Sequence, residues 1–158
     1  MPVIILPMHK DDINAVAAIH SEQFPRQQSS VKWVSCNFSA FPRIMIFVAR
    51  SEEDEVIGYI QWIQKSGFRK DAVVELEQIA VNQNYQHIGI GEKLIKESLS
   101  SVKNYLNDCQ SNLKAILVST GVDNKAQELY KKALGAEVIS VIKDLYSHDE
   151  VILLARQV

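Results

Sequence analysis

Residues 82–91 read NQNYQHIGIG, and this stretch decides the fold class because it joins two segments of different periodicity. Before it, AVVELEQIAV (residues 72–81) alternates from one face to the other in the manner of a strand. After it, apolar residues recur at helical spacing, at Leu94, Ile95, Leu99, Val102 and Leu106. The sequence therefore predicts a strand, a loop with two glycines, and a helix beginning near Gly91.

The chemistry of such a loop is the binding of phosphate. Gly89 and Gly91 let the main chain come close to a ligand, and the amides at a helix N-terminus attract an anion. Two common phosphate motifs do not match. A GxxxxGK[ST] loop would need a glycine five positions before Gly91, and a GxGxxG fingerprint would need glycine in place of Leu94.

Strand and helix patterns alternate along the rest of the chain, as in a mixed α/β domain built round one sheet. Further strands are predicted at residues 3–6, 44–50, 56–64, 113–120, 136–146 and 148–157, with 113–120 buried on both faces. Asp11 or Asp12 can cap a helix that ends near Phe24-Pro25, and Ser29 or Ser30 can cap a second helix that Pro42 terminates. A loop is predicted over residues 24–28, and a last helix over residues 124–134, closed by Gly135.

Composition excludes several classes of protein. A chain of 158 residues with 47% hydrophobic and 23% charged residues fits one folded domain, predicted to span residues 1–158. A net charge of −2 argues against general nucleic-acid binding. The N-terminal apolar run is too short for a signal peptide or a membrane span, so a soluble, cytoplasmic protein with no membrane partner is expected.

Metal and redox chemistry find no support in the sequence. Cys36 and Cys109 stand 73 positions apart and without CxxC spacing, so each is expected to be a buried or incidental thiol. The histidines at positions 9, 20 and 148 share no ligand spacing, and no metal is predicted.

Two stretches carry a family resemblance. Gln86-His87-Ile88-Gly89-Ile90-Gly91 resembles the Q/R-x-x-G-x-G/A signature of the GCN5-related N-acetyltransferase (GNAT) family. DNKAQELYKK (residues 123–132), followed by Leu134-Gly135-Ala136, resembles that family's N-x-x-A-x-x-L-Y-x-K…G-F stretch, with Ala136 in place of the aromatic residue. The resemblance implies the GNAT fold: a mixed, mostly antiparallel, splayed sheet of about seven strands flanked by about four helices. It also implies acetyl-CoA as co-substrate.

The resemblance assigns residues to the donor site. Backbone groups of Ile79, Ala80 and Val81 would pair with the pantetheine arm, and the amides of Gln86, His87, Ile88, Gly89, Ile90 and Gly91 would hold the pyrophosphate. Asp123, Asn124, Ala126 and Tyr130 would complete it. The family's asparagine aligns with Asp123, so either Asp123 caps the helix or the helix start slips by one residue. His87 is expected to contribute its backbone while its side chain is exposed, and the alternative is a partly protonated side chain beside the pyrophosphate.

The resemblance also suggests catalytic residues. Tyr130 would protonate the leaving thiolate, and the alternative is a tyrosine packed in the core. Glu75 or Glu77, with Glu77 the first choice, would take a proton from the amine, and the alternative is a solvated strand face. Phe24 and Arg26 lie in the segment that lines the acceptor site in this family, and the alternative for Arg26 is simple solvation.

The sequence therefore predicts transfer of an acetyl group to a primary amine by direct attack, without a covalent enzyme intermediate. The loop FPRQ (residues 24–27) faintly resembles ribosomal-protein N-terminal acetyltransferases, so protein N-termini stand among the candidate acceptors beside small amines. Two alternatives stay open: another acyl-CoA donor, and a non-catalytic CoA-binding or scaffold domain. The two closing strands could pair across a two-fold axis in a homodimer.

Overall fold

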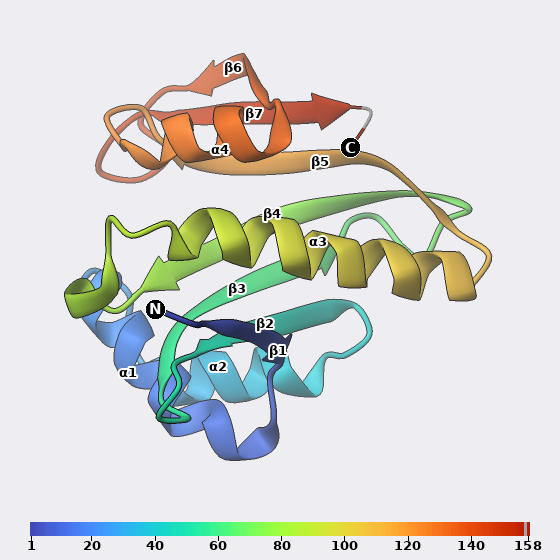
Figure 1. The fold of residues 1–158 in the computed structure, drawn as a ribbon. Coiled ribbons are helices and arrows are strands. Elements are labelled where there is room, and N and C mark those ends of the chain that lie inside the picture. The colour runs from blue at the N-terminus through green and yellow to red at the C-terminus, as the bar shows by residue number, and fades with distance from the viewer. Residues whose placement is uncertain (157) are drawn as a thin grey trace. The chain divides into compact units, whose positions relative to one another are not determined.

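The structure, a computed structural model, describes residues 1–156 and 158 and is an α/β fold (Figure 1). Its strands are β1 (Ile4–Pro7), β2 (Ile44–Arg50), β3 (Val56–Gln64), β4 (Asp71–Val81), β5 (Asn112–Gly121), β6 (Glu137–Ile142) and β7 (Glu150–Arg156). Its α-helices are α1 (Ile13–Gln23), α2 (Ser30–Ser39), α3 (Ile90–Asp108) and α4 (Ala126–Leu134). Two 3₁₀ turns, η1 (Lys10–Asp12) and η2 (Gln83–Tyr85), complete the order.

The strands form a seven-stranded sheet in the order β1-β2-β3-β4-β5-β7-β6. Strands β4 and β5 pair in parallel, whereas β1–β2, β5–β7 and β6–β7 are antiparallel. The β4–β5 ladder ends at Glu75 opposite Leu117, although both strands continue beyond it. The predicted fold class, a mixed and mostly antiparallel sheet with four helices, is confirmed.

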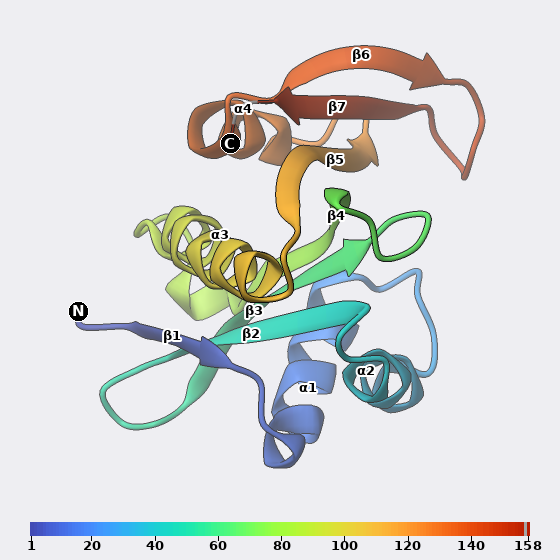
Figure 2. The ribbon, with the colours of Figure 1, turned by 90° about the vertical axis from the view of Figure 1, so that its right-hand side faces the viewer.

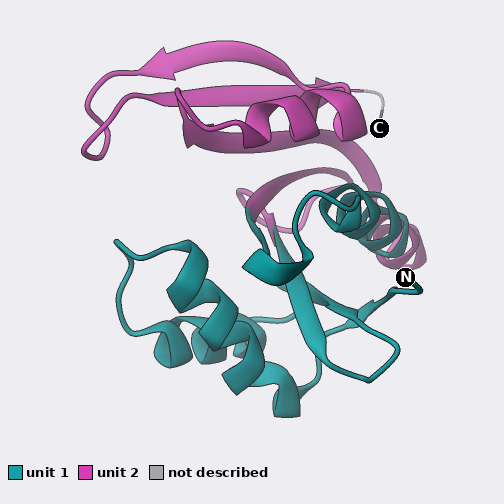
Figure 3. Cartoon of the chain, turned by 60° about the vertical axis from the view of Figure 1, so that its left-hand side comes forward, with its two compact units in different colours: residues 1–62, 78–102 teal, residues 63–77, 103–158 magenta. Residues whose placement is uncertain are grey.

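The chain divides into two compact units (Figure 3). Unit 1 comprises residues 1–62 and 78–102, and unit 2 comprises residues 63–77 and 103–158. In unit 1, β1 and β2 run side by side (Figure 2), and α1 packs on α2, which also contacts β2. In unit 2, α4 packs against β5, and Gly135 caps α4 in the left-handed conformation, as predicted.

Several local predictions were wrong. The strand predicted at 136–146 ends at Ile142, because a turn follows it. Strand β5 is not buried on both faces, since Lys114 and Ser119 are exposed. Asp12 does not cap α1 through its side chain, which instead accepts from the His9 amide and pairs with Arg50.

The remaining discrepancies are small. Neither Ser29 nor Ser30 caps α2 by a side-chain bond; the Ser29 backbone turns into the left-handed region, and Ser30 bonds to a histidine described below. Cys36 and Cys109 are both exposed, so neither is a core thiol. Gln157, the end of the predicted last strand, lies outside the described residues.

Two features are absent from the described part of the chain. None of the helices seen there is both long enough and apolar enough to cross a membrane. Among residues 1–156 and 158 there is also no group of three or more His, Cys, Asp or Glu side chains placed to share a metal ion.

The core of unit 1 contains a polar contact on which its stability should depend. Trp62, 1% exposed, donates its indole N–H to the hydroxyl of Ser98 over 2.8 Å, and Ser98 is fully buried on α3. We predict that Ser98→Ala lowers the free energy of unfolding by about 1–3 kcal/mol, because a buried donor then loses its acceptor. Urea unfolding of the variant measures this. Ser101→Ala, on the exposed side of the same helix, is the control and should leave the value unchanged; equal stability of the two variants would contradict the prediction.

Candidate active site

Strand β4 presents two different faces, as its sequence predicts. Val74, Leu76, Gln78 and Ala80 are buried, whereas Glu75, Glu77, Ile79 and Val81 are half-buried and share the other face. The two carboxylates therefore lie on one side of the strand, with partial access to water. Side chains in such a position can contact a ligand.

The electrostatic surroundings of Glu75 favour its protonated form relative to a solvated glutamate. Burial raises the pKa of Glu75 and is the largest cause; Lys65, whose ammonium lies 3.8 Å from the carboxylate, lowers it; and Glu77 raises it. The net pKa shift is upward. A carboxylate with a raised pKa is a stronger base, which suits proton removal near neutral pH.

The loop between β4 and α3 has the conformation expected of an anion-binding loop. The Asn82 side chain accepts from the Asn84 amide and begins η2. His87 and Gly89 then adopt positive φ values of 63° and 89°, and Gly89 supplies the conformation that a side chain would strain. Helix α3 begins at Ile90, one residue earlier than predicted.

The amides of this loop are free. In the described chain, the main-chain N–H groups from His87 to Gly91 donate to no other residue, and the first helical bond runs from the Lys93 amide to the Gly89 carbonyl. His87, Ile88 and Gly89 are exposed, as expected for His87. Consecutive free amides at a helix N-terminus form a site for an anionic group such as a phosphate.

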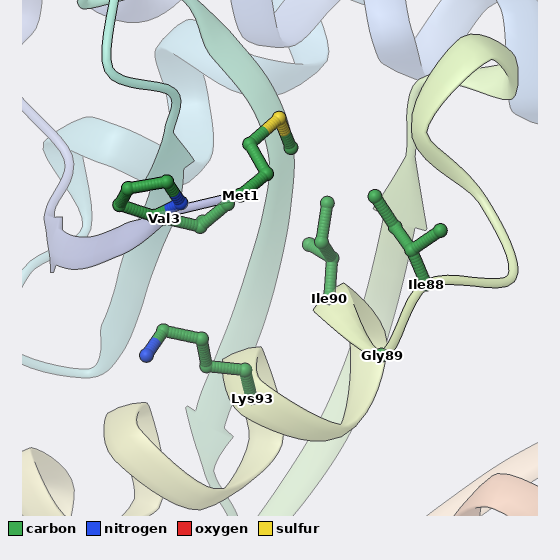
Figure 4. A pocket seen from close by; sticks show the side chains of 7 residues that line it. Met1, Val3, Ile88, Gly89, Ile90 and Lys93 are labelled. Atoms are coloured by element: carbon green, nitrogen blue, oxygen red, sulfur yellow. The ribbon is translucent and has the colours of Figure 1, made fainter.

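Side-chain charges near the helix start are paired with one another. Glu92 in the first turn binds Lys96 at 2.5 Å, and Lys93 binds Glu97 at 2.6 Å. The Lys96 ammonium thus offsets the one acidic residue of the first turn. A pocket of about 500 Å³ adjoins the loop; Figure 4 shows its lining, which consists of Met1, Pro2, Val3, Ile88, Gly89, Ile90 and Lys93.

The side chain of Gln86 braces the loop. Its amide nitrogen donates to the Val81 carbonyl over 2.8 Å and to the Gln23 side-chain oxygen over 3.0 Å. The neighbouring Gln83 amide donates to the Glu22 carboxylate over 3.1 Å. The loop is therefore tied both to the end of β4 and to the last turn of α1. The family resemblance assigned only the backbone amide of Gln86 to the site. The one sequence signal for a role of its side chain is that Gln86 is the first residue of the signature.

A cluster of polar side chains, which we call the Gln78 cluster, lies on the buried face of β4. Its hydrogen bonds join Gln78, Trp33, Tyr59, Gln27, His20 and Ser30. The Trp33 N–H and the Tyr59 hydroxyl both donate to Gln78 Oε1 at 3.0 Å. Because an indole N–H only donates, Gln78 must present its oxygen there and its NH₂ group to Gln27 Oε1, 3.0 Å away.

This orientation fixes the remaining partners of the Gln78 cluster. Gln27 Oε1 also contacts His20 Nε2 at 2.7 Å, so that nitrogen carries the proton, and His20 Nδ1 can accept from Ser30 Oγ at 2.8 Å. His20 is fully buried. The result is that the loop of residues 24–28 is held to β4 through Gln27. No sequence pattern predicted this cluster, since its members come from five separate elements of the chain: α1, the loop of residues 24–28, α2, β3 and β4.

The two residues predicted at the acceptor site lie in that loop. Phe24 is half-buried at the end of α1, and Arg26 is exposed beside the anchored Gln27. Both belong to unit 1, together with the Gln86 brace and the free amides.

Unit 2 holds the residues predicted from the second motif. Asn124 Oδ1 accepts from the Ala126 amide over 2.9 Å, at the start of α4, whereas Asp123 is exposed. Helix α4 begins at Ala126, two residues later than predicted, and its N-cap residue is Lys125, so neither Asp123 nor Asn124 is the N-cap.

Tyr130 is 6% exposed on α4, and burial raises its pKa to about 12. Its hydroxyl has no hydrogen-bond partner within the described residues. A phenol in this state keeps its proton over the whole physiological range and is available as a hydrogen-bond donor.

Comparison with known proteins identifies the class. Residues 13–136 match the acetyltransferase (GNAT) family, and the chain belongs to it. It is thus an N-acetyltransferase by family. A search of curated protein sequences finds no match.

Solved structures share the fold at low sequence identity. A GNAT-family protein from Desulfovibrio desulfuricans has 18% identity and a TM-score of 0.79, with 98% of this chain and 99% of that chain covered. NAA60 of Arabidopsis thaliana in complex with acetyl-CoA has 16% identity and a TM-score of 0.78, with 99% of each chain covered. A chain of the NatC complex bound to Gag peptide and CoA has 15% identity and a TM-score of 0.82, with both chains fully covered.

The Gln78 cluster yields a test of loop anchoring. We predict that Gln78→Leu speeds amide hydrogen exchange over residues 24–29 by at least tenfold, because the Trp33 and Tyr59 donors and the Gln27 side chain lose their common partner. Exchange measured by mass spectrometry on peptides of the loop reports this. Gln28→Ala, at an exposed site in the same loop, should leave the rates unchanged. Unaltered exchange in Gln78→Leu would show that the loop is held by other contacts.

Proposed function

We propose that this protein transfers the acetyl group of acetyl-CoA to a primary amine by direct attack in a ternary complex. The observation that carries the proposal is the set of free amides from His87 to Gly91 at the N-terminus of α3, within the signature of an acetyltransferase family. The pyrophosphate of CoA is a ligand of the charge and size that these amides bind.

The rest of the donor site follows β4. The backbone of Ile79, Ala80 and Val81 would pair with the pantetheine arm as an added strand does. Partial exposure of Ile79 and Val81 supports this. Gln86 holds the carbonyl of Val81 and so keeps the strand end and the amide loop in one arrangement. Asn124 and Ala126, at the start of α4, would complete the contacts to the donor.

In the proposed reaction the amine nitrogen attacks the thioester carbon, the C–S bond breaks, and CoA leaves as a thiolate. Glu75 or Glu77 accepts a proton from the attacking nitrogen. The upward pKa shift supports Glu75, whereas the sequence favoured Glu77. Holding the two reactants in an attack geometry can contribute roughly 7–11 kcal/mol to the lowering of the barrier.

The pKa of Tyr130 determines whether its hydroxyl protonates the leaving thiolate or only donates a hydrogen bond to it. A thiol has a pKa of about 8.5, so a phenol with a pKa of about 12 would not give up its proton to the thiolate. Tyr130 therefore donates a hydrogen bond to the sulfur and stabilises the negative charge that develops there. This differs from the proton transfer that the family resemblance implied.

The acceptor is proposed as a small amine or the N-terminus of a protein. The NatC chain that shares this fold was solved with a peptide and CoA, which supports the second choice. Phe24 and Arg26, in the loop anchored by Gln27, would contact the acceptor, with Arg26 suited to a carboxylate-bearing one. Use of another acyl-CoA, a homodimer, a single functional domain over residues 1–158 and a cytoplasmic location stay predictions.

The experiment that tests the proposal is an assay of CoA thiol release from acetyl-CoA across a panel of small amines, amino acids and short peptides with free N-termini. We predict release that depends on an added amine. Tyr130→Phe should lower kcat about 10- to 100-fold with little change in KM for acetyl-CoA, because the lost bond forms with the leaving group. Tyr105→Phe, at a half-buried tyrosine on α3, is the control and should leave kcat unchanged. Binding of acetyl-CoA without release under any amine would contradict the proposal.

The pH profile can identify the base. If Glu75 is the base, Lys65→Gln removes the cation that lowers its pKa, and the acid limb of kcat/KM moves to higher pH. Glu77→Gln removes the neighbour that raises that pKa, so the limb moves to lower pH while activity is retained. If Glu77→Gln loses activity and the acid limb of kcat/KM stays at the same pH in Lys65→Gln, then Glu77 and not Glu75 is the base.

A further inference from the structure

Unit 2 contains a hydrogen-bonded cluster, Ser119–Glu150–His148, that the proposed reaction does not use. The Ser119 hydroxyl donates to Glu150 Oε1 over 3.1 Å, and His148 Nε2 lies 3.1 Å from Glu150 Oε2. Glu150 is 7% exposed, so this carboxylate is buried with a partner at each oxygen. His148 is half-exposed just before β7.

The His148 ring is also fixed by packing. It lies against Gly121 at the end of β5, where an added Cβ would come within 3.1 Å of ring atoms Cδ2 and Nε2. The Tyr146 ring lies 6.1 Å away at a tilt of 37°. Two directional contacts and a hydrogen bond therefore hold the imidazole in one orientation. Such fixation is usual for side chains that act on a ligand and is not needed for a solvated surface histidine.

Strand register places this cluster on the same sheet face as the two candidate bases. Glu75 is opposite Leu117 on β5, and alternation brings Ser119 and Gly121 to the face of Leu117. Glu150 is opposite Gly121 on β7 and so shares that face. The face thus carries Glu75, Glu77, Ser119 and Glu150 within unit 2, whereas the other face of β5, with Ile116 and Val118, is buried.

The contacts determine what the imidazole can do. Because Glu150 accepts from Nε2, that nitrogen carries the proton, and Nδ1 has no partner among the described residues. A neutral imidazole with a free nitrogen is a proton acceptor, and imidazole exchanges protons readily near neutral pH. The buried Glu150 carboxylate would stabilise the imidazolium that forms. The Tyr146 ring packs beside the imidazole, and the carboxylate of Asp149, the next residue in the chain, accepts from the Asp144 amide.

We propose that His148 is a second proton acceptor in amine acetylation, with Glu150 as its positioning residue. An aliphatic amine arrives largely as an ammonium ion, which must lose two protons to become an amide. Nδ1 of His148 takes the first proton and leaves a neutral amine with a free electron pair. Glu75 or Glu77 takes the second proton as the nitrogen attacks and the C–S bond breaks. Each acceptor then returns its proton to water. This inference rests on the proposed function.

The test is the pH dependence of acetyl transfer by His148→Gln in the full chain, with the best amine from the panel as probe. Glutamine can keep the bond to Glu150 but accepts no proton at neutral pH. We expect kcat/KM for the amine to fall about 100-fold at pH 7, with KM for acetyl-CoA unchanged. The acid side of the pH profile of kcat/KM should show one ionisation fewer in His148→Gln than in the unmodified protein. Imidazole added to the variant should restore part of the rate. The matched control is His9→Gln, at an exposed histidine in unit 1.

The outcomes separate the two proposals. If His148→Gln keeps the rate and pH profile of His9→Gln, the role of His148 is overturned and the proposed function stands. A rate loss at every pH with an unchanged profile and no rescue by imidazole also overturns the role, since it shows a merely structural contribution. If the unmodified protein binds acetyl-CoA but transfers to no amine, both proposals fail. Glu150→Gln, with its fold checked by circular dichroism, should reproduce the changed profile more weakly.

Discussion

The side-chain amide of Gln86 holds the arrangement on which the account depends. By donating to the Val81 carbonyl and to Gln23, it joins the end of β4, the loop and the last turn of α1. The loop can then leave the amides from His87 to Gly91 without a protein partner and open to an anion. Positive φ at Gly89 completes the turn into α3. A donor site of this kind needs no basic side chain.

Burial gives each ionisable group of the proposed reaction a different role. Glu75 lies half-buried beside Lys65 and Glu77, and its raised pKa makes it a better base. Tyr130 is buried, and the rise of its pKa to about 12 makes it a hydrogen-bond donor that keeps its proton. His148 is fixed by a buried carboxylate, Glu150, with its second nitrogen unbonded. A reaction that removes two protons from a nitrogen and builds charge on a sulfur can use all three.

Local pattern was enough to predict much of this fold. Alternation in β4, helical spacing in α3 and the glycine at the end of α4 each follow from a single element, and each was confirmed. Features made by distant segments could not be predicted in this way. One hydrogen bond of the Gln78 cluster spans 51 positions of the sequence, and the bond from Ser119 to Glu150 spans 31. The Asp12 side chain likewise pairs with Arg50, which is distant in the sequence, instead of capping the adjacent helix. A tertiary ion pair thus replaced the local cap that the sequence predicted.

Calorimetric titration of acetyl-CoA into the purified protein tests the central claim most directly, with ATP and Gly89→Asp as controls. We expect micromolar binding of acetyl-CoA and of free CoA, no binding of ATP, and loss of CoA binding in Gly89→Asp, whose carboxylate would face the pyrophosphate among the free amides. Absence of heat and of any thermal shift with every CoA ester would contradict it, as would equal binding by the Gly89→Asp protein.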